Sequence, residues 1–223
     1  MKQPTKGEQT KSEILERVNA FFNLQGLDHT IADIAEHISM GKSRITNYFP
    51  RKELLIISLL RQHEDHLDAL VSQYQPGEKM IDFGNFIPFL SDVMELMFRY
   101  RGVIAYAMVN PGIGDEILLH IRRNYAQNKA RIRKRLEKFE QNGLITPDLL
   151  DPETFEEYFF QYACMSSNWV ISHNLLNPEK NLETVKLRYM RSILCCLKPY
   201  LTEKGGENLE NALSQLTQGQ TSG

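Results

Sequence analysis

Apolar residues recur every three to four positions through most of the chain, and the alternating pattern of a half-buried strand is almost absent. This period is that of an amphipathic helix with one buried face. Breaks rich in proline, glycine and asparagine separate the periodic segments. They lie at Pro50, Pro76-Gly77, Asn110-Pro111-Gly112, Asn142-Gly143 and Asn177-Pro178. The pattern predicts an all-α protein of about nine helices.

Caps and breaks set the bounds of the predicted helices. Thr10 and Glu13 have the spacing of a capping box, so we expect the first helix to follow them and to end near Leu24. A proline disfavours helical geometry in the residue before it, so Pro50 ends the third helix. The other predicted helices cover residues 31–38, 42–48, 52–74, 79–99, 102–109, 115–142, 152–173 and 181–203.

The segment from Thr30 to Phe49 predicts two short helices around a tight turn. Its apolar positions fit one small shared core, made of Ile34, Ala35, Ile38, Met40, Ile45, Tyr48 and Phe49. Helices that cross steeply need a small residue where their backbones approach, and Ala35 meets that need. The second helix of such a pair can enter a DNA groove.

Positive charge is concentrated at one end of this segment. Between His37 and Lys52 there are four basic residues, Lys42, Arg44, Arg51 and Lys52, and no Asp or Glu. A cation in the first turn of a helix is unfavourable by about 0.3–1 kcal/mol, because the helix N-terminus is already partly positive. A phosphate backbone would offset that cost, so the charge favours a DNA partner over a solvated basic surface.

Four motifs follow one another in an order known from one family. They are Phe21, Phe22 and Gly26, then Thr30 with Asp33-Ile34-Ala35, then Tyr48-Phe49, and then Arg51-Lys52-Glu53-Leu54-Leu55. With them, residues 9–60 resemble the DNA-binding region of the tetracycline-repressor (TetR) family of bacterial transcriptional regulators. The chain departs from the family pattern at Ser39, Gly41 and Thr46, where the family has glycine, serine and an aromatic residue. The resemblance implies a positive φ at Ser39, with modest strain, and Gly41 is an acceptable helix cap. Preference for a DNA sequence therefore does not carry over.

The resemblance implies that residues 42–48 lie in the major groove of a palindromic operator. Ser43, Arg44 and Asn47 are the candidates for base edges, because Arg pairs well with guanine and Asn with adenine. Phosphate contacts fix the protein on the duplex without reading its sequence. The candidates for these contacts are Thr30, Lys42, Thr46, Tyr48 and Lys52.

Residues 83–108 are rich in phenylalanine, tyrosine and methionine, which suits either a plain core or the lining of a site for a partly apolar small molecule. The resemblance implies an effector site in this region. The predicted lining residues are Met94, Phe98, Tyr106, Tyr125, Tyr162 and Trp169. The apolar faces of helices 152–173 and 181–203 are wider than one core needs, and the resemblance implies that they pair with a second copy in a homodimer.

We expect residues 1–52 to form a helix-turn-helix DNA-binding domain that continues into the helix from residue 52. Residues 53–204 are expected to form a helical domain for effector binding and dimerisation, and residues 205–223 a mobile tail. No apolar stretch reaches the roughly 18 residues of a membrane span, and the polar N-terminus is unlike a signal peptide, so the expected compartment is the cytoplasm.

We expect no enzymatic activity, no cofactor and no metal. Gly41-Lys42-Ser43 lacks the first glycine of a phosphate-binding loop, and His63 and His66 lack a third ligand at a defined spacing. The basic run in helix 115–142 fits a solvated face better than a second nucleic-acid site. The predicted function is a repressor that a small molecule releases from its operator. Two alternatives remain open: an architectural DNA-binding protein without an effector, and a helical small-molecule-binding protein that does not bind DNA.

Overall fold

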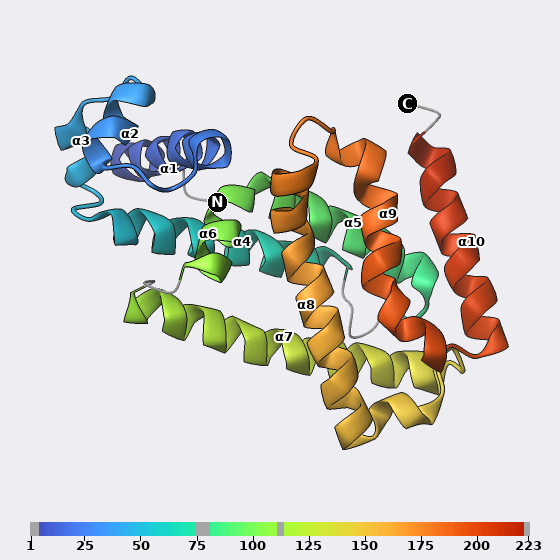
Figure 1. Cartoon of the computed structure of the whole chain (residues 1–223). Coiled ribbons are helices and arrows are strands. Elements are labelled where there is room, and N and C mark those ends of the chain that lie inside the picture. The colour runs from blue at the N-terminus through green and yellow to red at the C-terminus, as the bar shows by residue number, and fades with distance from the viewer. Residues whose placement is uncertain (1–4, 75–80, 111–113, 221–223) are drawn as a thin grey trace. The chain divides into compact units, whose positions relative to one another are not determined.

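The computed structural model describes residues 5–74, 81–110 and 114–220, and within these ranges it is helical without a strand (Figure 1). The α-helices are α1 (Lys6–Gln25), α2 (Ile31–His37), α3 (Lys42–Thr46), α4 (Lys52–Tyr74), α5 (Phe83–Arg99), α6 (Arg101–Val109), α7 (Asp115–Gln141), α8 (Pro152–Leu176), α9 (Leu182–Leu194) and α10 (Glu203–Gln220). Two 3-10 helices, η1 (Pro147–Leu150) and η2 (Cys195–Tyr200), complete them. The predicted all-α fold class is confirmed.

The chain divides into two compact units. Unit 1 is formed from residues 1–66 and 99–121, and unit 2 from residues 67–98 and 122–223. Unit 1 therefore combines α1 to α3 with the first part of α4, with α6 and with the first turns of α7. This division differs from a boundary at residue 52. None of the described helices combines the length and the apolar character that crossing a lipid bilayer requires.

The largest errors in the predicted helix bounds are at the start of the first helix and at the end of the helix over 181–203. The first helix begins at Lys6, because Thr5 and Glu8 form its capping box, whereas the Thr10 hydroxyl donates to the Lys6 carbonyl (2.9 Å) within the helix. The helix predicted over 181–203 ends as an α-helix at Leu194 and continues as η2. Pro199 lies in η2, where it lacks the N–H that an α-helix would need from it.

Residues 203–220 form α10, where we expected a mobile tail. Leu209, Ala212 and Leu213 have helical spacing and are buried in the core of unit 2. Gly205 allows the helix to start here, since a Cβ on this residue would lie only 1.8 Å from the carbonyl oxygen of Leu144. The expectation of mobility is thus wrong for residues 205–220, and residues 221–223 lie outside the described ranges.

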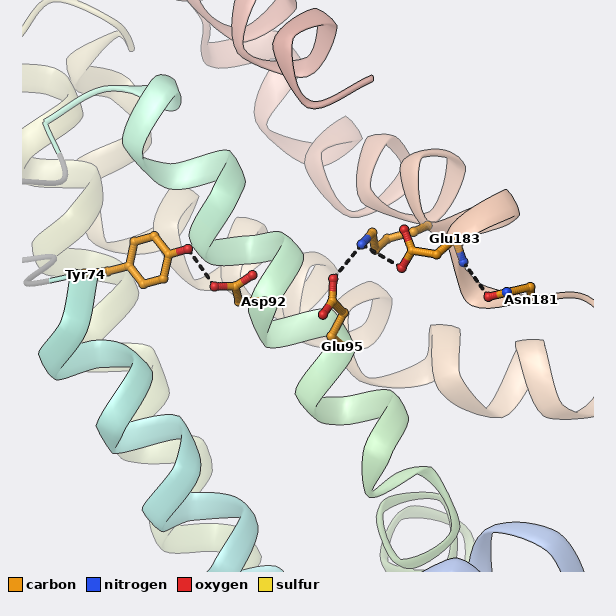
Figure 2. A network of polar contacts seen from close by, with 6 residues as sticks. Tyr74, Asp92, Glu95, Asn181 and Glu183 are labelled. Carbon is orange, nitrogen blue, oxygen red and sulfur yellow. Dashed lines mark hydrogen bonds and ion pairs between the residues drawn. The ribbon is translucent and has the colours of Figure 1, made fainter. Parts of the chain in front are cut away.

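In unit 2, polar contacts fix α5 to the helices on either side of it (Figure 2). The Tyr74 hydroxyl, at the end of α4, donates to Asp92 Oδ2 (2.6 Å). On α9, Lys186 Nζ donates to Glu95 Oε1 (2.7 Å) and to Glu183 Oε1 (3.0 Å). Lys186 is almost fully buried, and two carboxylates neutralise its charge.

In unit 1, α6 packs directly on the backbone of α1. A Cβ on Gly102 would lie 2.4 Å from the carbonyl oxygen of Phe22, so the two helices approach more closely than any other residue allows. Asn23 Oδ1 accepts a hydrogen bond from the Gly102 N–H (2.8 Å). The side-chain amides of Asn19 and Asn23 both donate to the Arg99 carbonyl, at 2.9 and 2.7 Å. The start of α6 is therefore fixed to the first helix of the chain.

Gly102→Ala tests this contact. The added methyl group forces α1 and α6 apart, and we expect a loss of about 1–3 kcal/mol in the free energy of unfolding. Thermal denaturation followed by circular dichroism measures it. The matched control is Gly206→Ala in α10, where a Cβ meets nothing within 4 Å and no destabilisation is expected. Equal shifts in the two variants would contradict a specific role for the α1–α6 contact.

Candidate nucleic-acid interface

The turn between α2 and α3 has the geometry that the sequence predicts. Ser39 has a φ of 53°, the expected positive value. The Met40 N–H donates to the Ala35 carbonyl (2.9 Å), which closes the turn over the small residue at the crossing. Gly41 is the N-cap of α3 and has no side chain with which to cap it. The first amides of α3 therefore receive no side-chain cap and stay available for an external acceptor.

The α3 segment has one buried face and one exposed face. Ile45 and Phe49 are buried at 0% and 1% exposure and anchor the segment to the core of unit 1. The α-helix ends at Thr46, but the Asn47 and Phe49 N–H groups still donate to the carbonyls of Ser43 and Ile45, so the helical path continues close to the predicted end. The exposed residues are Lys42, Ser43, Arg44, Asn47 and Tyr48, and Thr46 is half-buried. Among the residues expected to form the small shared core, Tyr48 alone is exposed and the others are buried.

Arg44, the principal candidate for base recognition, is engaged within the protein. Its Nη2 lies 2.8 Å from Glu13 Oε2 on α1. Glu13 also pairs with Arg17, whose Nη1 donates to the Ile38 carbonyl (3.2 Å) at the end of α2. The Arg44 side chain is still 49% exposed, so this pairing is a surface one. Base recognition by Arg44 would have to replace the bond to Glu13.

Three predicted phosphate contacts also have roles inside unit 1. The Thr30 hydroxyl donates to Asp33 Oδ2 (2.8 Å) and accepts from the Asp33 N–H (3.3 Å), which is a capping box for α2. Lys52 Nζ donates to the Leu27 carbonyl (2.9 Å). The Tyr48 hydroxyl lies beside Gly7, 3.7 Å from the position of a Cβ there. The capping spacing of Thr30 and Asp33 was visible in the sequence, but the bonds of Lys52 and Arg44 were not.

Within unit 1, three polar contacts join α4 to the residues around α6 and α7. The Tyr100 hydroxyl lies 3.0 Å from His66 Nδ1, His120 Nε2 lies 3.3 Å from Glu64 Oε2, and Arg61 Nη2 lies 3.5 Å from Glu116 Oε1. This first part of α4 is therefore fixed to α6 and α7 of the same unit.

His63 lies among these contacts and carries no charge at neutral pH. Burial, followed by the charges of His66 and His120, lowers the pKa of His63 to about 4, so its imidazole is neutral at pH 7. Across the described ranges, no three His, Cys, Asp or Glu side chains gather as a metal ion requires.

The predicted effector-lining residues fall into both units. Met94, Tyr162 and Trp169 belong to the buried core of unit 2, and Phe98 packs against it. Tyr125, also in unit 2, is 49% exposed and makes an edge contact with Phe159, with ring centroids 5.1 Å apart. Tyr106 belongs to unit 1. Their role as a ligand site stays a prediction.

The wide apolar stripe of α8 needs no partner to explain it. Phe155, Phe159, Tyr162 and Trp169, which we expected to leave surface for a second copy, are buried in the protomer's own core. Other apolar residues of the same helix are exposed instead, with Phe160 at 65% and Leu175 at 75%. Any apolar contact with a second copy through α8 would therefore use these residues.

With the geometry in place, comparison with known proteins identifies the family. A family model described as TetR, bacterial transcriptional repressor, matches residues 62–209, more than half of the chain. The protein belongs to this family. The match complements the motifs at residues 9–60, all of which precede it in the chain. No curated protein matches the sequence.

Solved structures show the same fold. A TetR-family transcriptional regulator from Marinobacter aquaeolei VT8 has a TM-score of 0.79 at 18% identity, covering 92% of this chain and 98% of that one. A gamma-butyrolactone receptor (ArpA-like protein) has a TM-score of 0.67 at 14% identity, covering 96% and 98%. The SmeT–triclosan complex has a TM-score of 0.58 at 11% identity, covering 87% and 93%. At these identities the likeness shows the fold alone.

The Glu13 contact yields a test on DNA. Glu13→Gln removes the charge that holds Arg44, so we expect DNA affinity to rise by up to about fivefold, the worth of an exposed ion pair. Titration of a labelled duplex followed by fluorescence anisotropy measures it. Glu16→Gln on the same helix is the control, since it makes the same charge change at an exposed residue. A rise of equal size in both variants would assign the effect to net charge and not to Arg44.

Proposed function

We propose that the protein is a repressor that binds a palindromic operator as a homodimer and leaves it when a small molecule binds. The observation that carries this proposal is the exposed face of α3. Lys42, Ser43, Arg44 and Asn47 are exposed there, while Ile45 and Phe49 hold the helix in the core of unit 1. A buried anchor with polar and basic side chains on the opposite face is what insertion into a major groove requires.

The contacts of unit 1 suggest how regulation would reach the DNA. Because α6, the start of α7 and the first part of α4 are fixed to each other and to α1, they would move with α2 and α3 as one body. The chain passes between the two units at three places: within α4, at the end of α5 and within α7. We propose that effector binding in unit 2 shifts α4 and so changes the spacing of the two recognition helices in the dimer. Two of the similar structures are a gamma-butyrolactone receptor and a triclosan complex, which supports a small, partly apolar effector.

The homodimer is the second part of the proposal. Exposed Phe160, Leu175 and Leu176 of α8, together with α9, would form the contact with a second copy. Two-fold symmetry places two α3 helices on successive turns of one face of the duplex, and this doubles the phosphate contacts. The compartment in which such a regulator acts is the cytoplasm.

The first experiment is binding to the DNA upstream of the protein's own coding sequence. A gel shift with random duplex as competitor, repeated across a salt series, separates operator binding from general attraction to phosphate. An architectural DNA-binding protein would bind both duplexes alike. A small-molecule-binding protein without a DNA role would retain neither.

Arg44→Ala and Lys52→Ala should affect DNA binding in different ways. Loss of a base contact at Arg44 should cost about 1–3 kcal/mol on the operator and relax one base position, with little effect on random DNA. Loss of a phosphate contact at Lys52 should weaken binding to all sequences alike and reduce the salt slope by about 1. The affinities of both variants for the operator and for random duplex distinguish a base contact from a phosphate contact. The thermal midpoint of Lys52→Ala is measured as well, since Lys52 also donates to the Leu27 carbonyl. If Arg44→Ala weakens both duplexes equally, its assigned role is wrong.

Phe160→Asp tests the dimer. A carboxylate in the middle of an apolar contact between copies should raise the dimer dissociation constant by about tenfold or more. Light scattering after size exclusion, over a range of concentrations, measures this constant. The control is Leu119→Asp, at another exposed apolar residue that is 68% exposed. A dimer that survives Phe160→Asp as well as it survives Leu119→Asp would place the interface elsewhere.

A further inference from the structure

Unit 2 buries one lysine and one arginine among its described residues, and they differ in what surrounds them. Lys186, 3% exposed, is neutralised by Glu95 and Glu183. Arg135, 8% exposed, has no ion pair and no hydrogen bond to any residue in the described part of the chain, and its Nε is buried without an acceptor. A buried cation without an anion is a costly arrangement that proteins rarely keep without a use.

Aromatic side chains form the surroundings of Arg135. Its guanidinium carbon lies 4.6 Å from the ring centroid of Phe86 and 5.1 Å from that of Phe89, both on α5. Tyr158 and Tyr162 of α8 are near enough to interact with its charge, and their rings stack with centroids 6.1 Å apart. We name these four residues the Arg135 cage. Cation–π contacts recover only part of the desolvation penalty of a buried guanidinium.

The cage leaves one donor of Arg135 without an acceptor. Among the described residues, Arg135 Nε is buried and has no hydrogen-bond partner. Burial lowers the pKa of Arg135, but a guanidinium remains protonated at neutral pH. What is missing around Arg135 is therefore one negative charge and an acceptor for Nε, among aromatic rings.

We propose that Arg135 is the anchor for an anionic effector, a small carboxylate with an apolar body. A carboxylate carries the single charge that one guanidinium can neutralise, and its two oxygens match Nε and a neighbouring Nη in a fork. A phosphate monoester would bring nearly two charges to a place with one cation. The apolar body would lie among the rings of α5 and α8. The inference rests on the proposed function for its regulatory meaning only.

The test uses matched ligands on the whole protein without DNA. The probes are 4-phenylbutyrate and octanoate, each compared with its own primary amide, which has the same skeleton and no charge. Binding is measured by calorimetry and by the fluorescence of Trp169, the only tryptophan of the chain, which lies in the same core as the cage. We expect each carboxylate to bind at least about tenfold more tightly than its amide, the effect of one charge-assisted contact.

Variants assign that preference to one side chain. Arg135→Met should bring the ratio of the two affinities close to one, and Arg135→Lys should restore only part of it, because lysine keeps the charge and loses the fork. Lys134→Met removes an exposed cation from the neighbouring position and should leave the ratio unchanged. No preference for the carboxylate in the wild type, or a preference that persists in Arg135→Met, overturns the proposal.

Thermal stability separates a ligand anchor from a structural arginine. Removal of an uncompensated buried charge should leave the thermal midpoint of Arg135→Met equal to that of Lys134→Met, or higher. A midpoint far below that of Lys134→Met would show that Arg135 is already paired in the folded protein, and would overturn the proposal. Since no DNA is present, these outcomes are independent of whether the protein recognises an operator.

Discussion

The approach of α6 to α1 at Gly102 is the contact on which the arrangement of unit 1 depends. With a side chain at this position, the Phe22 carbonyl could not lie where it does. The hydrogen bonds that the side-chain amides of Asn19 and Asn23 form with the start of α6 would then lose their geometry. Through this contact the helix-turn-helix forms one body with α6, a segment that lies more than 70 residues further along the chain. Unit 1 therefore contains α3, the proposed DNA-reading helix, together with α6 and the first part of α4.

The electrostatics of the proposed DNA face are set by competition within the protein. Glu13 binds Arg44 and Arg17 together, and it lies on α1, outside the segment whose charge pattern first indicated DNA. An exposed pair of this kind contributes little to stability, about 0.2–1 kcal/mol. It can nevertheless hold the guanidinium in one position before DNA arrives. A phosphate or guanine would then exchange one charge-assisted bond for another, which reduces the net gain in affinity but leaves specificity to the geometry of the base.

Sequence reasoning succeeded where the determinant is local. The spacing of Ile34, Ala35 and Ile45 indicated the helix pair, and the positive φ of Ser39 was implied by the glycine that the family has in this turn. It failed where the determinant lies far away in the chain. The pairing of Arg44 with Glu13 joins residues 31 positions apart, and no spacing rule reports such a contact. Gly205 explains why residues 205–220 were wrongly expected to be mobile. This glycine allows the backbone of α10 to approach the Leu144 carbonyl closely, and it does not mark a turn or a loop.

The contrast between the two buried cations of unit 2 could not have been read from the sequence either, since both residues lie on amphipathic helices with many charged neighbours. Lys186 forms ion pairs with Glu95 of α5 and Glu183 of α9, and the pair with Glu95 fixes these two helices to each other (Figure 2). Arg135 lies over two aromatic rings of α5 and near tyrosines of α8. Glu95 and Glu183 neutralise Lys186 and so hold α5 and α9 together. An anion bound at Arg135 would neutralise that charge in the same way and would hold α5, α7 and α8 together. Because α7 continues into unit 1, such a ligand would act on a helix that belongs in part to the proposed DNA-binding unit. Under the proposed function, this would couple ligand occupancy to the position of α3.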